Sequence, residues 1–188
     1  MSAQSKVLIT GASSGIGSVY ADRFAQRGHH LILVARDTNR LDKISRDLQA
    51  KYGVQVEFIQ ADLSKDQDIS KIEDVLKNDA DIEILVNNAG ITLSGNFLTQ
   101  DIKEIETLMT LNMTAVVRLS HAVSEQLVRK GKGSIINLGS VVGLSPEFGS
   151  TIYGASKSFI HFFSQGLHLE LKDHGVHAVS YTHLTLPT

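Results

Sequence analysis

Short apolar runs recur along the chain, and longer segments with helical spacing separate them. The runs are rich in Val, Ile and Leu with few polar interruptions, a pattern typical of strands that helices cover on both faces of a sheet. The sequence predicts six such strands, over Lys6–Thr10, His30–Ala35, Val54–Gln60, Ile82–Asn87, Ser134–Leu138 and Val176–Ser180.

The intervening segments repeat apolar residues every three or four positions, as the buried face of a helix requires. They predict helices over Ile16–Arg27, Leu41–Tyr52, Ile69–Leu76, Ile102–Lys130 and Ile152–Lys172. Residues 102–130 are enough for two helices or one bent helix. Strict alternation of strands and helices indicates an α/β fold, and right-handed crossovers make it a doubly wound parallel sheet with helices on both faces.

Composition narrows the functional classes. The chain has 188 residues, which suits one domain, and 18 Lys and Arg stand against 20 Asp and Glu for a net charge of -2. Without a basic excess, nucleic-acid binding is disfavoured. The absence of Cys excludes disulfides, thiolate zinc sites and cysteine nucleophiles. No signal peptide or long apolar run is present, so we expect a soluble cytoplasmic protein with no membrane partner.

A glycine-rich loop, Thr10–Gly17 (TGASSGIG), joins the first predicted strand to the first helix. Gly11 permits the tight turn, Gly15 lets the backbone approach a pyrophosphate, and Gly17 allows close packing of helix and strand. An ordinary strand-to-helix turn has a similar composition, but the place of the loop in the first βαβ unit favours dinucleotide binding. No Lys-Ser or Lys-Thr pair follows, which excludes a nucleotide-hydrolysing P-loop.

The end of the second strand carries the residues that face the cofactor's adenosine ribose. A site for NAD usually places an acidic side chain there, about 20 residues beyond the glycines. Here the strand ends on Ala35, and Arg36 follows. A guanidinium pairs well with the 2′-phosphate of NADP(H). Asp37 argues the other way, but one position later it is expected to point to solvent or to cap the next helix. The sequence therefore favours NADP(H) over NAD(H).

Candidate catalytic residues lie in and before the last predicted helix. Tyr153 and Lys157 are four residues apart, so they share a helix face. A cation near a phenol lowers its pKa, which suits Tyr153 to act as general acid in carbonyl reduction and as base in alcohol oxidation. Ser140 follows the fifth strand at the end where open parallel sheets bind ligands. Taken alone, the Tyr-Lys spacing is weak evidence, because it arises by chance about one time in four. A loop serine is usually structural. The eight histidines form no ligand set with Asp or Glu, so no metal site is predicted.

Together these motifs resemble the short-chain dehydrogenase/reductase family, in its branch with TGxxxGxG and YxxxK. They occur in the family's order across residues 6 to about 178. The matching motifs are Thr10–Gly17, Asp62-Leu63, Asn87–Gly90 (NNAG), Asn112, Ser140 and Tyr153–Lys157 (YGASK). The resemblance implies a Rossmann fold and an NAD(P)(H)-dependent oxidoreductase, expected to reduce a ketone or aldehyde with NADPH or to oxidise a secondary alcohol in reverse.

The resemblance also implies roles for single residues. Tyr153 would exchange a proton with the substrate oxygen, and Lys157 would hold the nicotinamide ribose and adjust the tyrosine. Ser140 would orient the carbonyl, and Asn112 would anchor a water in the proton relay. The implied cofactor contacts are Gly11, Ser13, Ser14, Gly15, Ile16, Gly17, Arg36, Asp62, Leu63, Asn88, Gly90, Tyr153 and Lys157.

Some of these positions have structural alternatives. Asn87 and Asn88 could mainly tie the fourth strand to its neighbours, and Asp62 could cap a turn rather than contact adenine. Two other functional interpretations also stay open. One is a nucleotide-binding regulator or scaffold without turnover. The other is an epimerase or dehydratase of the extended family branch, against which the glycine spacing argues.

The family resemblance implies a small-molecule carbonyl or alcohol substrate and a homodimer or homotetramer, with the last two long helices at the subunit interface. The substrate pocket would be lined by Leu93–Phe97 and by Val141–Phe148, which suggest an apolar site. Residues 1–179 form a single NAD(P)-binding domain in this interpretation. Residues 180–188 (SYTHLTLPT) match none of the family's pattern and resemble a translated sequencing adapter, so we expect a non-native tail. The family's last strand would then be missing from the sheet, and the truncated chain is expected to be poorly soluble or inactive. The alternative is a real, shortened protein with a polar tail.

Overall fold

The computed structural model of the chain describes residues 5–146 and 149–182. Within these residues the sheet has six parallel strands in the order β3-β2-β1-β4-β5-β6. The strands are β1 (Lys6–Thr10), β2 (His30–Ala35), β3 (Val56–Gln60), β4 (Ile82–Asn87), β5 (Gly133–Leu138) and β6 (Val176–Tyr181). The order reverses between β1 and β4, which is the place where open sheets of this kind bind ligands. The doubly wound parallel sheet predicted from the sequence is confirmed.

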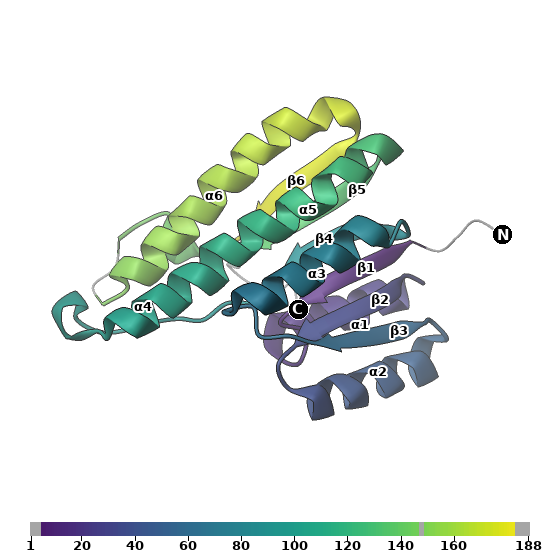
Figure 1. Ribbon diagram of the computed structural model, residues 1–188, viewed down its shortest axis with the longest axis horizontal. Helices are drawn as coiled ribbons and strands as arrows, with labels where there is room; N and C mark the ends of the chain where they lie inside the picture. Colours follow the sequence, from purple (N-terminus) through teal and green to yellow (C-terminus); the bar gives the residue numbers. More distant parts are fainter. Residues whose placement is uncertain (1–4, 147–148, 183–188) are drawn as a thin grey trace.

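Helices cover both faces of the sheet, as Figure 1 shows. They are α1 (Gly15–Gln26), α2 (Thr38–Tyr52), α3 (Asp66–Asn78), α4 (Ile102–Met109), α5 (Ala115–Lys130) and α6 (Thr151–Leu171). Alternate residues of β1 point to opposite faces, so Val7 and Ile9 pack with α1 and α2 whereas Leu8 packs with α3 and α5. Two apolar cores therefore hold the sheet, one on each face.

Two helices begin earlier than the apolar spacing predicts, because their first turns are polar. α2 begins at Thr38, where the Asp37 carboxylate accepts a hydrogen bond from the backbone N–H of Arg40 at 3.0 Å. Asp37 is therefore a side-chain cap of α2, which is one of the two roles that the sequence predicts for it. α3 begins with Asp66 and Asp68 in its first turn, where negative charge is favourable at the positive end of the helix dipole.

Residues 102–130, predicted as two helices or one bent helix, form one continuous helical segment that contains a π turn. Figure 1 shows α4 and α5 running end to end. Residues 110–114 between them form a π turn, which contains the buried Asn112. Such turns insert an extra residue into a helix and commonly occur at functional sites. The wide turn rotates Asn112 to face the loop after β4.

Strand β6 extends one residue beyond its predicted end. Ser180 pairs with Asn137 and Tyr181 with Leu138, so the first residues of the proposed tail lie in the sheet. The rest of the tail, residues 183–188, lies outside the described residues, as do residues 147–148 of the expected substrate pocket. Among the described helices, none combines the length and the apolar character needed to cross a bilayer.

Candidate functional site

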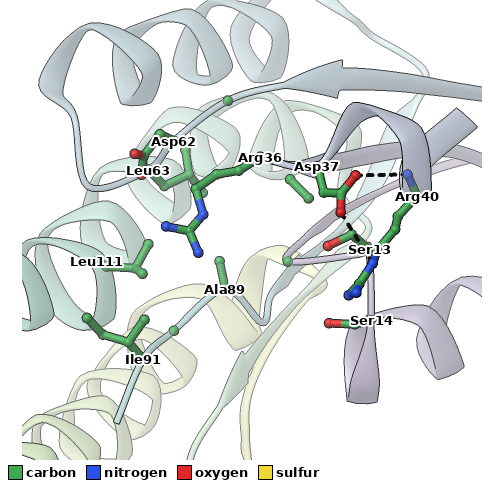
Figure 2. A pocket seen from close by; sticks show the side chains of 14 residues that line it. Ser13, Ser14, Arg36, Asp37, Arg40, Asp62, Leu63, Ala89, Ile91 and Leu111 are labelled. Carbon is green, nitrogen blue, oxygen red and sulfur yellow. Dashed lines mark hydrogen bonds and ion pairs between the residues drawn. The ribbon is translucent and has the colours of Figure 1, made fainter. Parts of the chain in front are cut away.

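The loops at the carboxyl ends of β1, β2, β3 and β4 enclose a cavity of about 380 Å³. It lies where the strand order reverses, as expected for a dinucleotide site. Figure 2 shows the Arg36 side chain extending into the cavity between Asp62 and Ala89, with Arg40 on the side of Ser13 and Ser14. The lining residues are Gly11, Ser13, Ser14, Ala35, Arg36, Asp37, Arg40, Ala61, Asp62, Leu63, Ala89, Gly90, Ile91 and Leu111.

The glycine loop leaves no room for side chains on its inner surface. Gly11 has a φ of 66°, a conformation that favours glycine. A Cβ on Gly17 would collide with the carbonyl oxygen of Gly11 and lie 2.5 Å from Nδ2 of Asn88. α1 starts within this loop, and its N-cap, Ser14, makes no side-chain cap. The first N–H groups of α1 are therefore not capped by Ser14, which suits them to bind phosphate.

Asn88 and Thr10 lock the glycine loop to the end of β4. Nδ2 of Asn88 donates to the carbonyl oxygens of Thr10 at 2.9 Å and Gly11 at 3.2 Å. In return, Oγ1 of Thr10 accepts the backbone N–H groups of Asn88 and Ala89, each at 3.0 Å. These bonds give the Asn88 side chain the structural role of tying β4 to β1, and its contact with the cofactor stays a prediction.

Two arginines bring positive charge to the end of β2. Arg36 is exposed and projects into the cavity. Arg40, one helical turn later, also lines the cavity, and its Nε lies 3.2 Å from Oδ2 of Asp37. The sequence analysis missed Arg40. Its position in the first turn of α2, directly after the loop that carries Arg36, is the sequence signal that could have identified it.

Asp62 closes the cavity on the side of β3. Its Oδ1 accepts both the backbone N–H of Ser64 at 3.2 Å and the Ser64 hydroxyl at 2.7 Å. Partial burial works to raise the pKa of Asp62, but these hydrogen bonds and the nearby charge of Arg36 outweigh it and hold that pKa below its usual range. Asp62 thus caps a turn and also lines the cavity, and its contact with the adenine stays a prediction. An apolar wall of Leu63, Ile91 and Leu111 stands beside it.

Asn112 ties the π turn to the loop after β4. Its Oδ1 accepts the backbone N–H of Ile91 at 2.9 Å, and its Nδ2 donates to the Ile91 carbonyl oxygen at 2.9 Å. The same amide nitrogen lies 3.4 Å from the Ser156 hydroxyl, which donates to the Tyr153 carbonyl oxygen at 2.7 Å. A chain of hydrogen bonds therefore connects the loop after β4 with the residues before Lys157.

Lys157 is buried, with 8% of its surface exposed, although it carries an amine. Its Nζ lies 5.7 Å from the centre of the Tyr153 ring and donates to the Leu138 carbonyl oxygen at 2.6 Å. Burial lowers the pKa of Lys157 to about 8, because the charged form loses its hydration. The predicted shared face of Tyr153 and Lys157 is present, with the cation close to the phenol ring.

Ser140 starts a single 3-10 turn, residues 141–143, directly after β5. Its Oγ accepts the backbone N–H of Val142 at 3.3 Å, and its carbonyl oxygen accepts that of Gly143 at 3.0 Å. The turn packs against α6, the helix that carries Tyr153 and Lys157. Ser140 is therefore fixed by backbone geometry at the carboxyl end of the sheet.

The structure separates the expected site residues into groups. Those that line the cavity are Gly11, Ser13, Ser14, Arg36, Asp62, Leu63 and Gly90. Gly15 and Ile16 lie exposed at the start of α1, and Gly17 is packed under it. The four expected catalytic residues lie outside the cavity, on the π turn, after β5 and on α6. In the described part of the chain, no three His, Asp or Glu side chains gather as metal ligands would.

Comparisons with known proteins agree on one family. The family model described as short chain dehydrogenase matches residues 5–183. The very-long-chain 3-oxoacyl-CoA reductase of Anas platyrhynchos is 34% identical over 174 residues, which cover 90% of this chain and 55% of that protein. The chain thus spans 55% of the length of this curated relative.

Two solved structures are more similar in sequence. The bulky-bulky ketone specific alcohol dehydrogenase from Comamonas testosteroni is 47% identical with a TM-score of 0.94, over 100% of this chain and 77% of that one. A short-chain dehydrogenase from Sphingobium yanoikuyae, solved in complex with NADPH, is 53% identical with a TM-score of 0.93, over 95% of this chain and 70% of that one.

Proposed function

The chain belongs to the short-chain dehydrogenase family, and we propose that it is a reductase that converts a ketone or aldehyde to an alcohol with NADPH. The observation that carries this proposal is the pairing of Tyr153 with the buried Lys157 on α6. A buried ammonium beside a phenol stabilises the phenolate, so the phenol gives up a proton more readily. That proton is what a carbonyl oxygen must gain on reduction.

The residues of the cavity fit a nicotinamide dinucleotide. At the start of α1, the space beside Gly15 is open, and the first backbone N–H groups have no side-chain cap from Ser14. When bound, the cofactor supplies the hydride. Ser13, Ser14 and the first turn of α1 would hold its phosphates, and the wall of Leu63 and Leu111 would contact the adenine.

We propose that the four catalytic candidates act on the substrate side of this site. Tyr153 would donate the proton to the carbonyl oxygen, and Ser140 would hold that oxygen by a hydrogen bond. Lys157 would place its positive charge beside the phenol of Tyr153 and bind the nicotinamide ribose through Nζ. Asn112 would anchor a water molecule in the relay that supplies a new proton to Tyr153. The hydrogen bonds of Asn112 to Ile91 add a structural function, since they fix the loop on which Gly90 lies.

Preference for NADP(H) rests on the two guanidiniums of Arg36 and Arg40 at the end of β2. Asp37 does not compete as a ribose ligand, because its carboxylate caps α2 and pairs with Arg40. The Sphingobium relative was solved with NADPH, which is consistent with this choice in a related site.

The substrate is proposed to be apolar and bulky. Val141 and Leu144, which follow Ser140 after β5, expose apolar side chains, and Phe97 and Leu98 before α4 are exposed as well. A homodimer or homotetramer is proposed through α5 and α6, since Phe162 on α6 is 81% exposed. Cytoplasmic location and the non-native origin of residues 180–188 stay predictions.

The decisive experiment replaces Tyr153 with Phe and measures NADPH oxidation with a panel of ketones and aldehydes. Wherever the unaltered chain turns over, we expect a loss of at least about a hundredfold in Tyr153→Phe, because general acid catalysis is removed. Tyr20→Phe, on α1, is the matched control and should retain turnover. Turnover that survives in Tyr153→Phe would contradict the catalytic assignment. NADPH binding without turnover in the unaltered chain would favour the regulator or scaffold.

A further inference from the structure

Side chains of α6 form hydrogen bonds with several carbonyl oxygens of residues 138–143, the segment that carries Ser140. Besides Lys157, two further side chains contact carbonyl oxygens of this segment. The Oγ of Ser158 lies 2.5 Å from the carbonyl oxygen of Gly143, and Nε2 of His161 lies 3.3 Å from that of Ser140. His161 is one helical turn beyond Lys157, so both side chains project toward the same segment.

The contact of His161 has a defined direction. A carbonyl oxygen only accepts hydrogen bonds, so Nε2 of His161 carries the proton in this contact. The same oxygen of Ser140 also accepts the backbone N–H of Gly143 at 3.0 Å. Both lone pairs of the carbonyl are therefore used, one to close the 3-10 turn and one to attach that turn to α6.

Close packing removes the freedom of the turn to slide along α6. A Cβ on Gly143 would lie 2.6 Å from the backbone carbonyl carbon of Lys157 and 2.7 Å from the backbone nitrogen of Ser158. A Cβ on Gly139 would lie 3.2 Å from Cε1 of His161. The segment on either side of Ser140 thus lies directly on the helix, and the hydrogen bond of His161 lies between these two contacts.

We propose that His161 is a positioning residue that fixes Ser140 relative to Tyr153, because its imidazole N–H anchors the Ser140 carbonyl to the helix that carries the tyrosine. The proposal deepens the reductase function and rests on it for the role of Ser140. Tyr153, Lys157 and His161 follow one another at intervals of four on α6. One rigid helix then sets the relative position of the two hydroxyls that act on the carbonyl.

The first test is hydrogen exchange on the purified chain, which requires no turnover. His161→Leu removes the donor, and His161→Gln keeps a side-chain N–H. We expect amide exchange at Val142 and Gly143 to accelerate about tenfold in His161→Leu, with little change in His161→Gln. His121→Leu, an exposed histidine on α5, is the matched control and should leave these amides unchanged.

Three exchange results would overturn the anchoring. These are unchanged exchange at the turn in His161→Leu, equal acceleration throughout the β1 and β2 strands, and equal acceleration in His161→Gln. The second test measures reduction kinetics wherever the unaltered chain turns over. We expect His161→Leu to lower kcat about tenfold with the KM for NADPH unchanged, and His161→Gln to restore it. Unchanged kcat in His161→Leu would overturn the positioning role. A chain without turnover that shows the exchange effect would contradict the reductase proposal and leave the anchor of Ser140 supported.

Discussion

Asn112 binds both backbone polar groups of Ile91, accepting its N–H and donating to its carbonyl oxygen at 2.9 Å each. The Asn112 amide thus forms with the backbone of Ile91 the two hydrogen bonds that a neighbouring strand would form with it in a sheet. The π turn makes it possible, because the extra residue in the helix rotates Asn112 toward the loop after β4.

Replacing Asn112 with Leu should therefore destabilise the fold locally and globally. Both polar groups of Ile91 would lose their partner, which costs about 1–3 kcal/mol of unfolding free energy. Chemical denaturation measures the loss, and hydrogen exchange at the Ile91 amide locates it. Asn78→Leu, at the exposed end of α3, is the control and should change little. Equal stability of Asn112→Leu and the unaltered chain would show that the pair contributes nothing.

Gly17 in α1 and Gly166 in α6 differ in the space that surrounds them. Gly17→Ala places a methyl group against the Gly11 carbonyl oxygen and Asn88, whereas a Cβ on Gly166 in α6 meets nothing within 4 Å. Gly17→Ala should lower the midpoint of urea unfolding and abolish NADPH binding, because the loop must open. Gly166→Ala should raise that midpoint, since alanine favours a helix over glycine by about 1 kcal/mol. A Gly17→Ala chain that binds NADPH normally would disprove the close approach.

Lys157 predicts a pH dependence of stability. Its pKa is about 8 when folded, against 10.5 for an exposed lysine. Between these two values the unfolded chain binds a proton that the folded chain does not, so the unfolding free energy due to Lys157 rises with pH in this window. Below the window the buried charge is present in the folded state and destabilises it.

The size of this effect is about 3 kcal/mol across the window, as the pKa difference implies. Urea unfolding of the unaltered chain and of Lys157→Met at the two ends of the window would measure it. We expect the unaltered chain to gain stability relative to Lys157→Met as the pH rises. Parallel pH profiles for the two chains would mean that Lys157 is not desolvated.

Arg36 should decide between the two cofactors. Replacing it with Ala removes charge-assisted hydrogen bonds to a 2′-phosphate, which weakens NADPH binding by about tenfold to a hundredfold. NADH lacks this phosphate, so its dissociation constant should change far less. Titration calorimetry with both cofactors measures the difference, and Arg46→Ala on α2, away from the cavity, serves as the control. Equal losses for NADPH and NADH would remove the assignment of Arg36.

Much of the fold could be predicted from the apolar periodicity, and the largest errors in the element bounds lie at the starts of α2 and α3. β1, β2 and β4 have the predicted bounds, because their apolar runs end at polar or glycine residues. α2 and α3 start earlier than predicted, because Asp37 and Asp66 act through capping and the helix dipole, which an apolar pattern does not contain. The π turn at 110–114 left no signal in the spacing that was used.

The sequence by itself determined the doubly wound sheet, the glycine loop at its first turn, and the pairing of Tyr153 with Lys157 on one helix face. These follow from local periodicity and spacing, which act within a few residues of chain. Only the tertiary structure decided that Asn112 binds Ile91, that Asp62 binds Ser64 inside the cavity, and that Arg40 joins Arg36 there. It also placed His161 against Ser140. The contacts of Asn112 with Ile91 and of His161 with Ser140 each join residues 21 positions apart, so they exist only once the strands have set the positions of their loops. Asp62 and Arg40 act close to their own strands, but only the fold brings the ends of β2 and β3 to one cavity.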